Sequence, residues 1–354
     1  MKENKSYQDA VELLQKLIAT SSFSKEEDKT AAIIELFFSQ KSIPSNRLLN
    51  NVWCINKHFD SGKPTILLNS HHDTVKPNPQ YTKDPFSPMI EEGKLFGLGS
   101  NDAGGCLVSL IAAFCHFYER DDLKYNIILA ATAEEEISGK NGIESILSSL
   151  PTIDFAIVGE PTLTNLAIAE KGLLVLDCTA VGKAGHAARE EGDNAVYKAI
   201  KDISWFQTYQ FPKVSETLGP IKMSVTSINT ENKAHNVVPA VCSFIVDIRV
   251  TDVYTHEEIL ETIQLHIQSE VKPRSMGLRS SKIEKDHPLV QAGIKLGKQI
   301  YGSPTTSDGA LIPAPILKCG PGDSARSHTA DEFIYLKEIE EGIDTYIKIL
   351  EQVV

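Results

Sequence analysis

The segment Thr65-Ile66-Leu67-Leu68-Asn69-Ser70 runs directly into His71-His72-Asp73. A short apolar run bounded by turn residues is typical of a buried strand, and this one ends in residues that bind metals or transfer protons. Two further runs have the same texture, Ile127-Ile128-Leu129-Ala130 and Phe155-Ala156-Ile157-Val158, and a helical pattern covers Leu107 to Phe117. Strands alternating with helices predict an α/β domain whose mixed, mostly parallel sheet is flanked by helices.

Charged residues also follow the other predicted strands. Glu134-Glu135-Glu136 comes after the second run, Gly159-Glu160-Pro161 after the third, and Pro315 to Cys319, the expected last strand, leads through a glycine-rich loop to His328. In open α/β sheets ligands bind at the carboxyl ends of the strands. We therefore expect these groups to converge in one crevice.

A further acid, Asp102, lies in a glycine-rich turn that runs from Gly97 to Gly105 before the Leu107 helix. Glycines let a backbone turn sharply and approach a ligand closely. Gly97-Leu98-Gly99 resembles the start of a dinucleotide-binding fingerprint, but Asp102 occupies the position of its third glycine, so we reject that interpretation. Gly322-Asp323-Ser324-Ala325-Arg326 likewise lacks the final glycine of a serine hydrolase motif.

The texture changes near Lys171, where apolar and polar residues begin to alternate. A helix is expected from Asn194 to Phe206, strands from Lys222 to Ile228 and from Cys242 to Val250, and a second helix from Thr255 to Ile267. This pattern predicts an inserted α+β domain of the β-α-β-β-α-β type over residues 172–279. The first domain then comprises residues 1–171 and 280–354, with Lys272 to Gly277 as the way back into it.

The first domain is expected to open with two helices. Ala10, Leu13, Leu14 and Leu17 fall on one helical face, and Ser24 with Glu27 has the spacing of a capping box before the second helix.

The composition of the chain indicates which classes of molecule it can bind. The formal net charge is -12 and the pI is near 5.4, so phosphate-rich surfaces would be repelled and neither nucleic acid nor an acidic membrane is expected to bind. The six cysteines are scattered, which suits a reducing compartment better than a disulfide framework. No apolar run approaches the roughly 18 residues that a membrane span needs, and no targeting segment is recognisable. We expect a cytoplasmic protein that acts on small molecules.

Two histidines and several carboxylates form a nitrogen and oxygen ligand set suited to zinc, and also to cobalt or manganese. Five candidate ligands suffice for two divalent ions that share a bridging carboxylate, an arrangement that activates water and polarises a carbonyl. One acid must then stay uncoordinated to accept a proton. Taken singly, each of these residues would more often be a solvated or hydrogen-bonded side chain. Their shared position after strands favours a site.

At this point the sequence resembles a known family, the di-zinc aminoacylases and exopeptidases that include acetylornithine deacetylase and succinyl-diaminopimelate desuccinylase. The resemblance spans nearly the whole chain and rests on six ordered motifs. They are His71-x-Asp73-Thr74-Val75, Gly97-x-Gly99 through Asp102, Thr132-Ala133-Glu134-Glu135-Glu136, Gly159-Glu160-Pro161-Thr162, Gly185-His186-Ala187-Ala188, and Gly320-Pro321-Gly322 leading to His328.

The resemblance implies a role for each position. His71 and Glu160 would hold one metal, Glu136 and His328 the other, and Asp102 would bridge them. Asp73 would orient His71 through its other ring nitrogen, His72 would not coordinate, and Glu135 would be the general base. The family usually has Asp-Glu-Glu at Glu134-Glu135-Glu136. The alignment of these three residues therefore determines which glutamate is the base and which is the metal ligand. Family members also have a cis peptide bond after the bridging aspartate, here Asp102-Ala103.

In the second domain the resemblance implies that His186 stabilises the oxyanion, from a closing lid or from the partner subunit of a homodimer. Arg249 would bind the substrate carboxylate with help from Asn236, although Arg249 could instead pair with Asp247 or Asp252. The implied activity is metal-dependent hydrolysis of an N-acyl-L-amino acid, foremost N2-acetyl-L-ornithine in arginine biosynthesis. Alternatives are removal of a succinyl group, with Arg326 meeting the acidic acyl group, cleavage of di- or tripeptides, and a metal-free binding protein.

Overall fold

The computed structural model describes residues 2–354, with side chains from residue 5 onward. The chain divides into two compact units. The first comprises the residues up to Ala169 together with Lys282–Tyr301 and Ser307–Val354, and the second comprises Glu170–Ser281 and Gly302–Thr306. The chain enters the second unit at Glu170 and leaves it after Ser281, in each case two residues from the expected boundary. The segment Gly302–Thr306, which the sequence pattern assigns to the first domain, belongs to the second unit.

The larger sheet has nine strands in the order β1-β2-β6-β3-β7-β17-β8-β15, with β16 paired to β8. Strands β6, β3, β7 and β17 pair in parallel at its centre, whereas β2 and β8 join them antiparallel. The predicted mixed and mostly parallel sheet is thus confirmed. The strands are β1 (Asn46–Leu48), β2 (Asn51–Ile55), β3 (Thr65–His71), β6 (Asn126–Thr132), β7 (Phe155–Val158), β8 (Leu166–Glu170), β15 (Ser281–Lys282), β16 (Ile300–Ser303) and β17 (Ile316–Lys318).

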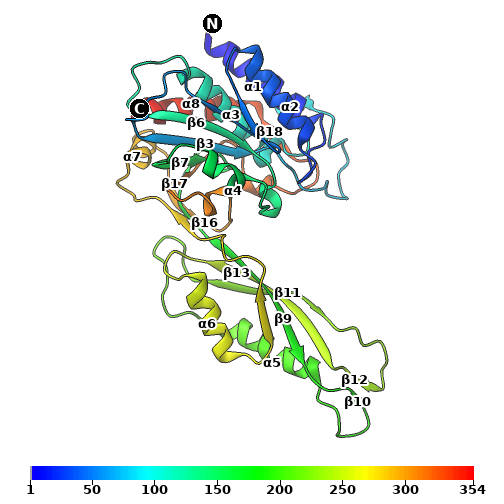
Figure 1. Cartoon of the computed structure of the whole chain (residues 1–354). Coiled ribbons are helices and arrows are strands. Elements are labelled where there is room, and N and C mark those ends of the chain that lie inside the picture. Colours follow the sequence, from blue (N-terminus) through cyan, green and yellow to red (C-terminus); the bar gives the residue numbers. More distant parts are fainter. Residues whose placement is uncertain (1) are drawn as a thin grey trace. The chain divides into compact units, whose positions relative to one another are not determined.

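Helices cover the sheet on both faces, and successive residues of the central strands point into different cores. Ile66 and Leu68 of β3 pack into the core under the long helices, while Leu67 packs into a second, smaller core. Helix α3 lies against β3 and contacts both α1 and α8 (Figure 1). The helices of this unit are α1 (Lys2–Ile18), α2 (Asp28–Gln40), α3 (Gly105–Phe117), α4 (Ile143–Ile146), α7 (Pro288–Lys295) and α8 (Leu336–Glu351).

A small antiparallel sheet in the first unit joins distant segments. Strand β5 (Lys94–Phe96) lies between β4 (Met89–Glu91) and β18 (Phe333–Tyr335). Phe333 is registered against Phe96, directly before the glycine-rich turn that bears Asp102. The pairing therefore holds the chain just after His328 beside this turn.

The second unit contains a four-stranded antiparallel sheet in the order β11-β13-β9-β14. Its strands are β9 (Gly172–Val181), β11 (Lys222–Asn229), β13 (Val241–Val250) and β14 (Glu270–Pro273), and its helices are α5 (Ala195–Thr208) and α6 (His256–His266). The alternate residues Leu174, Leu176 and Cys178 enter its core, as their periodicity predicted. The α+β class is confirmed, but β14 includes Lys272 and Pro273, which the sequence pattern assigns to the connection back to the first domain.

The expected capping box at the start of α2 is wrong. Glu27 is the residue before the helix, and its side chain makes no capping bond. Ser24 instead donates its hydroxyl to Oδ2 of Asp73 at 2.7 Å, and the Glu27 carboxylate accepts the backbone N–H of Lys25 at 2.7 Å and of Glu134 at 3.2 Å. Both side chains form hydrogen bonds with loops that are distant in sequence, and the local spacing of residues does not reveal such partners. Over residues 2–354, none of the helices is both long and apolar enough to cross a membrane.

Candidate metal centre

The predicted ligands of the first unit gather where its central strands end. His71 is the last residue of β3, the three glutamates follow β6, Glu160 follows β7, and the loop after β17 leads to His328. Asp102 comes from the turn before α3. Parallel neighbours end at the same edge of the sheet, so residues far apart in sequence meet there.

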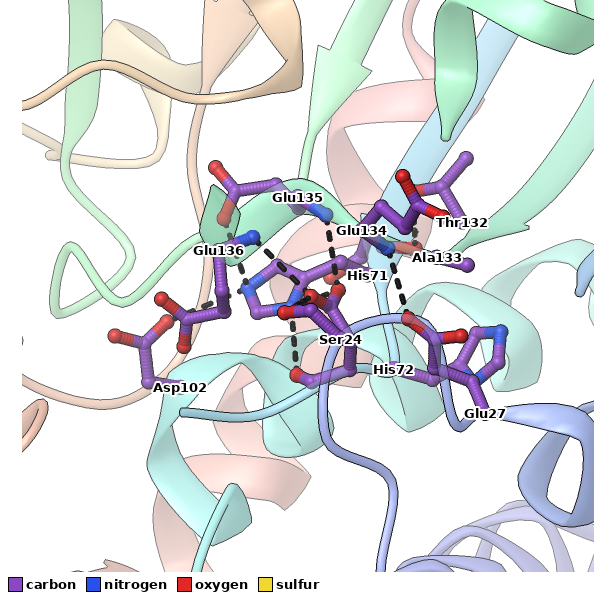
Figure 2. A network of polar contacts seen from close by, with 12 residues as sticks. Ser24, Glu27, His71, His72, Asp102, Thr132, Ala133, Glu134, Glu135 and Glu136 are labelled. Atoms are coloured by element: carbon purple, nitrogen blue, oxygen red, sulfur yellow. Dashed lines mark hydrogen bonds and ion pairs between the residues drawn. The ribbon is translucent and has the colours of Figure 1, made fainter. Parts of the chain in front are cut away.

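The ring of His71 is at the centre of this cluster. The side chain is buried, and its Nε2 atom makes no hydrogen bond. Around Nε2 lie Oδ1 of Asp102 at 3.5 Å, Oε2 of Glu135 at 3.8 Å and Oε1 of Glu160 at 3.8 Å. These distances exceed an ordinary hydrogen bond. In Figure 2, Glu135 and Asp102 lie around one side of the His71 ring, and His72 lies beyond the other side next to Glu27.

Asp102 faces both histidines of the cluster. Its Oδ1 atom is 3.5 Å from Nε2 of His71, and its Oδ2 atom is 3.6 Å from Nε2 of His328. The peptide bond that follows, Asp102-Ala103, is cis, as the resemblance implied. Gly97 and Gly99 in the preceding turn have φ angles of 146° and 74°, in the region that favours glycine. Each oxygen of one carboxylate can thus serve a different ion.

The adjacent glutamates point to different neighbours. The Nε2 atom of His328 lies 3.0 Å from Oε2 and 3.2 Å from Oε1 of Glu136. Glu135 instead approaches Nε2 of His71. Among the side chains that the structure describes, two groups have ligand atoms mutually close enough to hold an ion. They are His71 with Asp102 and Glu136, and His71 with Glu135 and Glu160. The first contains only expected ligands but joins His71 to Glu136, which the resemblance assigns to different ions, and the second includes the expected base Glu135.

His72 is turned away from the cluster. Its Nδ1 atom lies 2.9 Å from the hydroxyl of Thr30, and its Nε2 atom lies 2.9 Å from the carbonyl oxygen of Asn50. Both ring nitrogens are therefore engaged in the protein. Burial lowers the pKa of His72 to about 4, which keeps the ring neutral.

Asp73 supports the site in two ways. The Nδ1 atom of His71 donates to the backbone carbonyl of Asp73 at 3.0 Å, closer than the Asp73 carboxylate at 3.4 Å. The carboxylate itself accepts the backbone N–H groups of Glu135 and Glu136 at 3.1 and 3.2 Å. Asp73 thus positions both the histidine ring and the loop of the two glutamates.

The cluster concentrates negative charge in a poorly hydrated place. Burial and the neighbouring Glu160 raise the pKa of Glu135 well above its usual value, against the opposing effect of His71. Burial would lower the pKa of His71, but the carboxylates of Glu135, Asp102 and Asp73 raise it well above normal. The hydrogen bond to Glu136 raises the pKa of His328 to about 9. Cations would offset this charge.

These residues fit a pair of divalent metal ions. The observation that decides is the Nε2 atom of His71, a buried nitrogen without a hydrogen bond that faces three carboxylates. An unbonded buried polar atom is costly, and a metal ion would satisfy it. Imidazole nitrogen with carboxylate oxygen, and no thiolate, is a donor set for zinc, cobalt or manganese.

The second unit brings two of its three predicted residues together. His186 lies in β10 (Gly185–His186), which pairs with β12 (Val237–Val238), and the carbonyl of Asn236 accepts the N–H of Ala187 at 2.9 Å. Arg249 lies elsewhere, near the end of β13. Its Nε and Nη2 atoms bond the carboxylate of Asp247 at 2.8 and 3.0 Å, the pairing that the sequence left open.

Arg326 also forms an ion pair within the protein. Its Nη1 and Nη2 atoms bond the carboxylate of Glu338 at 2.9 and 2.6 Å, and its guanidinium lies over the rings of Phe333 and Tyr335. Such a bidentate pair with aromatic contacts is a stable arrangement. The expectation that Arg326 could meet an acidic acyl group has no support in this geometry.

Three buried acids near the cluster were missed. Glu27 and Glu332 accept backbone N–H groups of the loops that carry Glu134 and Asp102. Asp308 accepts the hydroxyl of Thr132 at 2.6 Å, and burial raises the pKa of Asp308 to about 6. None follows a predicted strand. The only hint for Glu332 is that it lies four residues after His328.

The fold and this cluster define a metal-dependent amidohydrolase. Residues 67–352 match Peptidase family M20/M25/M40, and the chain belongs to this family. It is 30% identical to the acetylornithine deacetylase of Buchnera aphidicola over 352 residues, covering 91% of each chain. It is 27% identical to succinyl-diaminopimelate desuccinylase 2 of Ruegeria over 277 residues, covering 74% of this chain and 70% of the relative.

Its fold is similar to that of a dinuclear metal binding peptidase from Bacillus subtilis. The TM-score is 0.73 at 16% sequence identity, and the similarity covers 99% of this chain and all of the other. The expected enzyme class, a metal-dependent amidohydrolase, is confirmed by this family membership.

Proposed function

We propose that this enzyme removes the acyl group from an N-acyl-L-amino acid, and that its substrate is N2-acetyl-L-ornithine, as in arginine biosynthesis. The observation that supports this substrate is the similarity to an acetylornithine deacetylase along 91% of both chains. Desuccinylases of 26 and 27% identity match 80 and 74% of this chain, so the similarity supports a succinyl substrate comparably.

In the proposed centre His71 and Glu160 would hold one ion, Glu136 and His328 would hold the other, and Asp102 would be a ligand of both. When bound, two such ions lower the pKa of a water molecule and polarise the substrate carbonyl. Glu135, whose carboxylate lies beside His71, takes the proton from the attacking water and passes it to the leaving amine. Asp73 holds the backbone of Glu135 and Glu136 during this transfer. Zinc is the proposed native metal, with cobalt and manganese as substitutes.

Removal of a succinyl group is the second candidate, because a relative of similar sequence identity, 27%, is a desuccinylase. A succinyl substrate has an additional carboxylate, and a buried carboxylate needs a cationic partner. Arg326 is bound to Glu338 and does not supply it. This pairing removes Arg326 as an argument for the succinyl substrate. Peptide cleavage is a third candidate because the family includes peptidases.

An assay of matched substrates tests the proposal. Acetyl-ornithine, succinyl-ornithine, succinyl-diaminopimelate and an unmodified dipeptide are compared by kcat/KM with the zinc-loaded enzyme. We expect acetyl-ornithine to be preferred by at least about tenfold, a difference of about 1.4 kcal/mol in transition-state binding. Preference for either succinyl substrate, or for the dipeptide, would contradict the assignment.

We also propose that the enzyme works in the cytoplasm as a homodimer formed through its second unit, with His186 completing the site of the partner subunit. The six cysteines, all within the described residues, are free thiols, as in a reducing compartment. His186 is exposed, and the one described hydrogen bond of its side chain is with the N–H of Ala188 at 3.1 Å, so Nε2 is available to a substrate.

Mixing two inactive variants tests this arrangement. A dimer of Glu135→Gln with His186→Ala would contain one intact site if His186 acts across the interface. Activity should therefore return on mixing and subunit exchange. If the dimer exchanges but activity stays absent, His186 acts within its own chain. A monomer by light scattering would remove the proposal altogether.

A further inference from the structure

Glu332 makes an unusual number of contacts with the turn that carries Asp102. Its side chain is 2% exposed. The Oε1 atom accepts the backbone N–H groups of Asn101 at 2.8 Å and Asp102 at 2.9 Å, and Oε2 accepts that of Gly99 at 3.1 Å. The backbone carbonyl of Glu332 also accepts the N–H of Gly97 at 3.0 Å. One residue thus binds the turn at four points.

This turn needs an outside acceptor. Asp102 has φ -117° and ψ 98°, so the backbone is not helical where the ligand stands. Buried N–H groups that lack a helical or sheet partner must find another acceptor, since leaving them unbonded is costly. A carboxylate is well suited because its two oxygens can accept several N–H bonds at once.

Glu332 also connects the turn to the opposite side of the cluster. It lies between His328 and β18, and β18 is paired with β5 directly before the turn. The neighbouring Asp331 accepts the N–H groups of Thr82 and Lys83 at 2.8 and 2.9 Å, which fixes the chain that follows His328. The distance between Asp102 and His328 therefore depends on the segment that contains Glu332.

We propose that Glu332 is a positioning residue that sets the Asp102 carboxylate against His71 and His328, so that the two oxygens of Asp102 each face one metal ion. This inference rests on the metal centre of the proposed function. Glu332 does not touch substrate or metal, and it acts only through the backbone of the turn. Loss of a group that orients a metal ligand typically lowers metal affinity or activity by about 10- to 100-fold.

The informative variant is Glu332→Gln. The amide oxygen of glutamine can still accept the N–H groups of Asn101 and Asp102, but its NH₂ group would face the N–H of Gly99, where no hydrogen bond can form. Glu332→Asp keeps the charge and withdraws the carboxylate by one methylene. It serves as a second variant if the glutamine variant does not fold.

The matched control is Asp202→Asn in the second unit. Asp202 is also buried, and its Oδ2 atom accepts the N–H groups of Gln268 and Ser269 at 3.2 and 2.8 Å. It has no part in the metal centre. A variant there should lower thermal stability without changing metal binding, so it reports what loss of a buried backbone acceptor does by itself.

The test is titration of each metal-free full-length protein with Co²⁺, followed by its visible absorption, with steady-state kinetics on the zinc-loaded forms. We expect Glu332→Gln to bind Co²⁺ about 10- to 100-fold more weakly, with a fall in kcat rather than a rise in KM. Glu332→Asp should be intermediate, and Asp202→Asn should match wild type in affinity.

Wild-type Co²⁺ affinity in either folded Glu332 variant would overturn the inference while leaving the proposed function intact. Wild-type protein that binds no Co²⁺ would remove the metal centre and the inference together. If the enzyme binds metal but does not hydrolyse acetyl-ornithine, only the substrate proposal fails, because the Co²⁺ titration still decides the role of Glu332.

Discussion

Nε2 of His328 lies 3.0 Å from Oε2 of Glu136, although 192 residues separate them in the chain. The neighbouring glutamate, Glu135, faces His71 instead. Both glutamates lie in a short 3-10 helix (Glu135–Ile137), where successive side chains point about 120° apart. This allows one glutamate to bind metal while the next remains a base.

The division of roles between these glutamates predicts different losses. Glu135→Gln should retain both metal ions and lower kcat by about 10²- to 10⁴-fold, because only proton transfer is removed. Glu136→Gln should lose one ion. Metal content per chain and kcat are measured for both, with the exposed Glu144→Gln as control. Loss of metal in Glu135→Gln alone would mean that the two roles are reversed.

Removal of the metal should abolish hydrolysis and lower stability. Prolonged treatment with a chelator is expected to eliminate activity, and Zn²⁺ should restore it. Since the ions bind the folded chain, free metal at 100 times its Kd should contribute about 2.7 kcal/mol of stability per site. Thermal unfolding with and without Zn²⁺ measures this. Full activity after complete removal, verified by elemental analysis, would refute the metal centre.

The two adjacent histidines should respond in opposite ways. His72→Leu leaves the carbonyl of Asn50 without its partner, while the hydroxyl of Thr30 keeps its bond to the carbonyl of Glu27 at 3.0 Å. Unfolding should therefore be easier by about 1–3 kcal/mol. Metal content should not change. His71→Leu should lose metal instead. Denaturant unfolding and metal analysis of both variants distinguish the roles, and a loss of metal in folded His72→Leu would contradict them.

Arg249 provides a test of carboxylate binding. We propose that the Nη1 edge of its guanidinium binds the substrate carboxylate while Nε and Nη2 stay on Asp247. Arg249→Met should then raise KM about 10-fold or more with kcat little changed. Asp247→Asn keeps the arginine and serves as the control. Equal kinetics of wild type and Arg249→Met would show that the pair is only structural.

The second unit should lose stability in mild acid because of His256. This residue is 1% exposed, its Nδ1 atom lies 3.2 Å from the carbonyl of Met276, and burial lowers its pKa below the usual 6.5. The unfolded chain therefore takes up a proton more readily than the folded one. Stability is full above pH 6.5 and falls as the pH drops from there toward the lowered pKa of the folded state.

His256→Asn checks this prediction. Asparagine can donate to the same carbonyl but does not titrate, so the free energy of unfolding should depend less on pH between 7 and 5 than in wild type. The exposed His58→Asn should leave that dependence unchanged. An unaltered pH profile in His256→Asn would exclude His256 as its source.

Much of the first unit could be predicted because its signals are local. The apolar run Thr65–Leu68 and the residues after it define both β3 and His71. The same logic placed Glu136 and Glu160 after their strands. Alternation in β9 and the helix signals at Asn194 and Thr255 likewise follow from burial on one face and from hydrogen bonds at helix ends.

What could not be predicted are the partners of buried acids. Glu27, Asp308 and Glu332 accept bonds from chain segments far away in sequence, and no periodicity marks such a bond. The same holds for Ser24, whose spacing from Glu27 suggested a helix cap although its hydroxyl bonds Asp73. Arg249 could be placed at a strand end with Asp247 or Asp252 as candidate partners, and only the structure distinguishes between them, in favour of Asp247.

Anomalous diffraction from zinc-loaded crystals, recorded on both sides of the zinc absorption edge, tests the central claim most directly. The arrangement predicts two peaks, one beside His71 and Glu160 and the other beside Glu136 and His328, with the Asp102 carboxylate between them. A single peak, or two peaks of which neither lies against Asp102, would contradict a metal pair bridged by this residue.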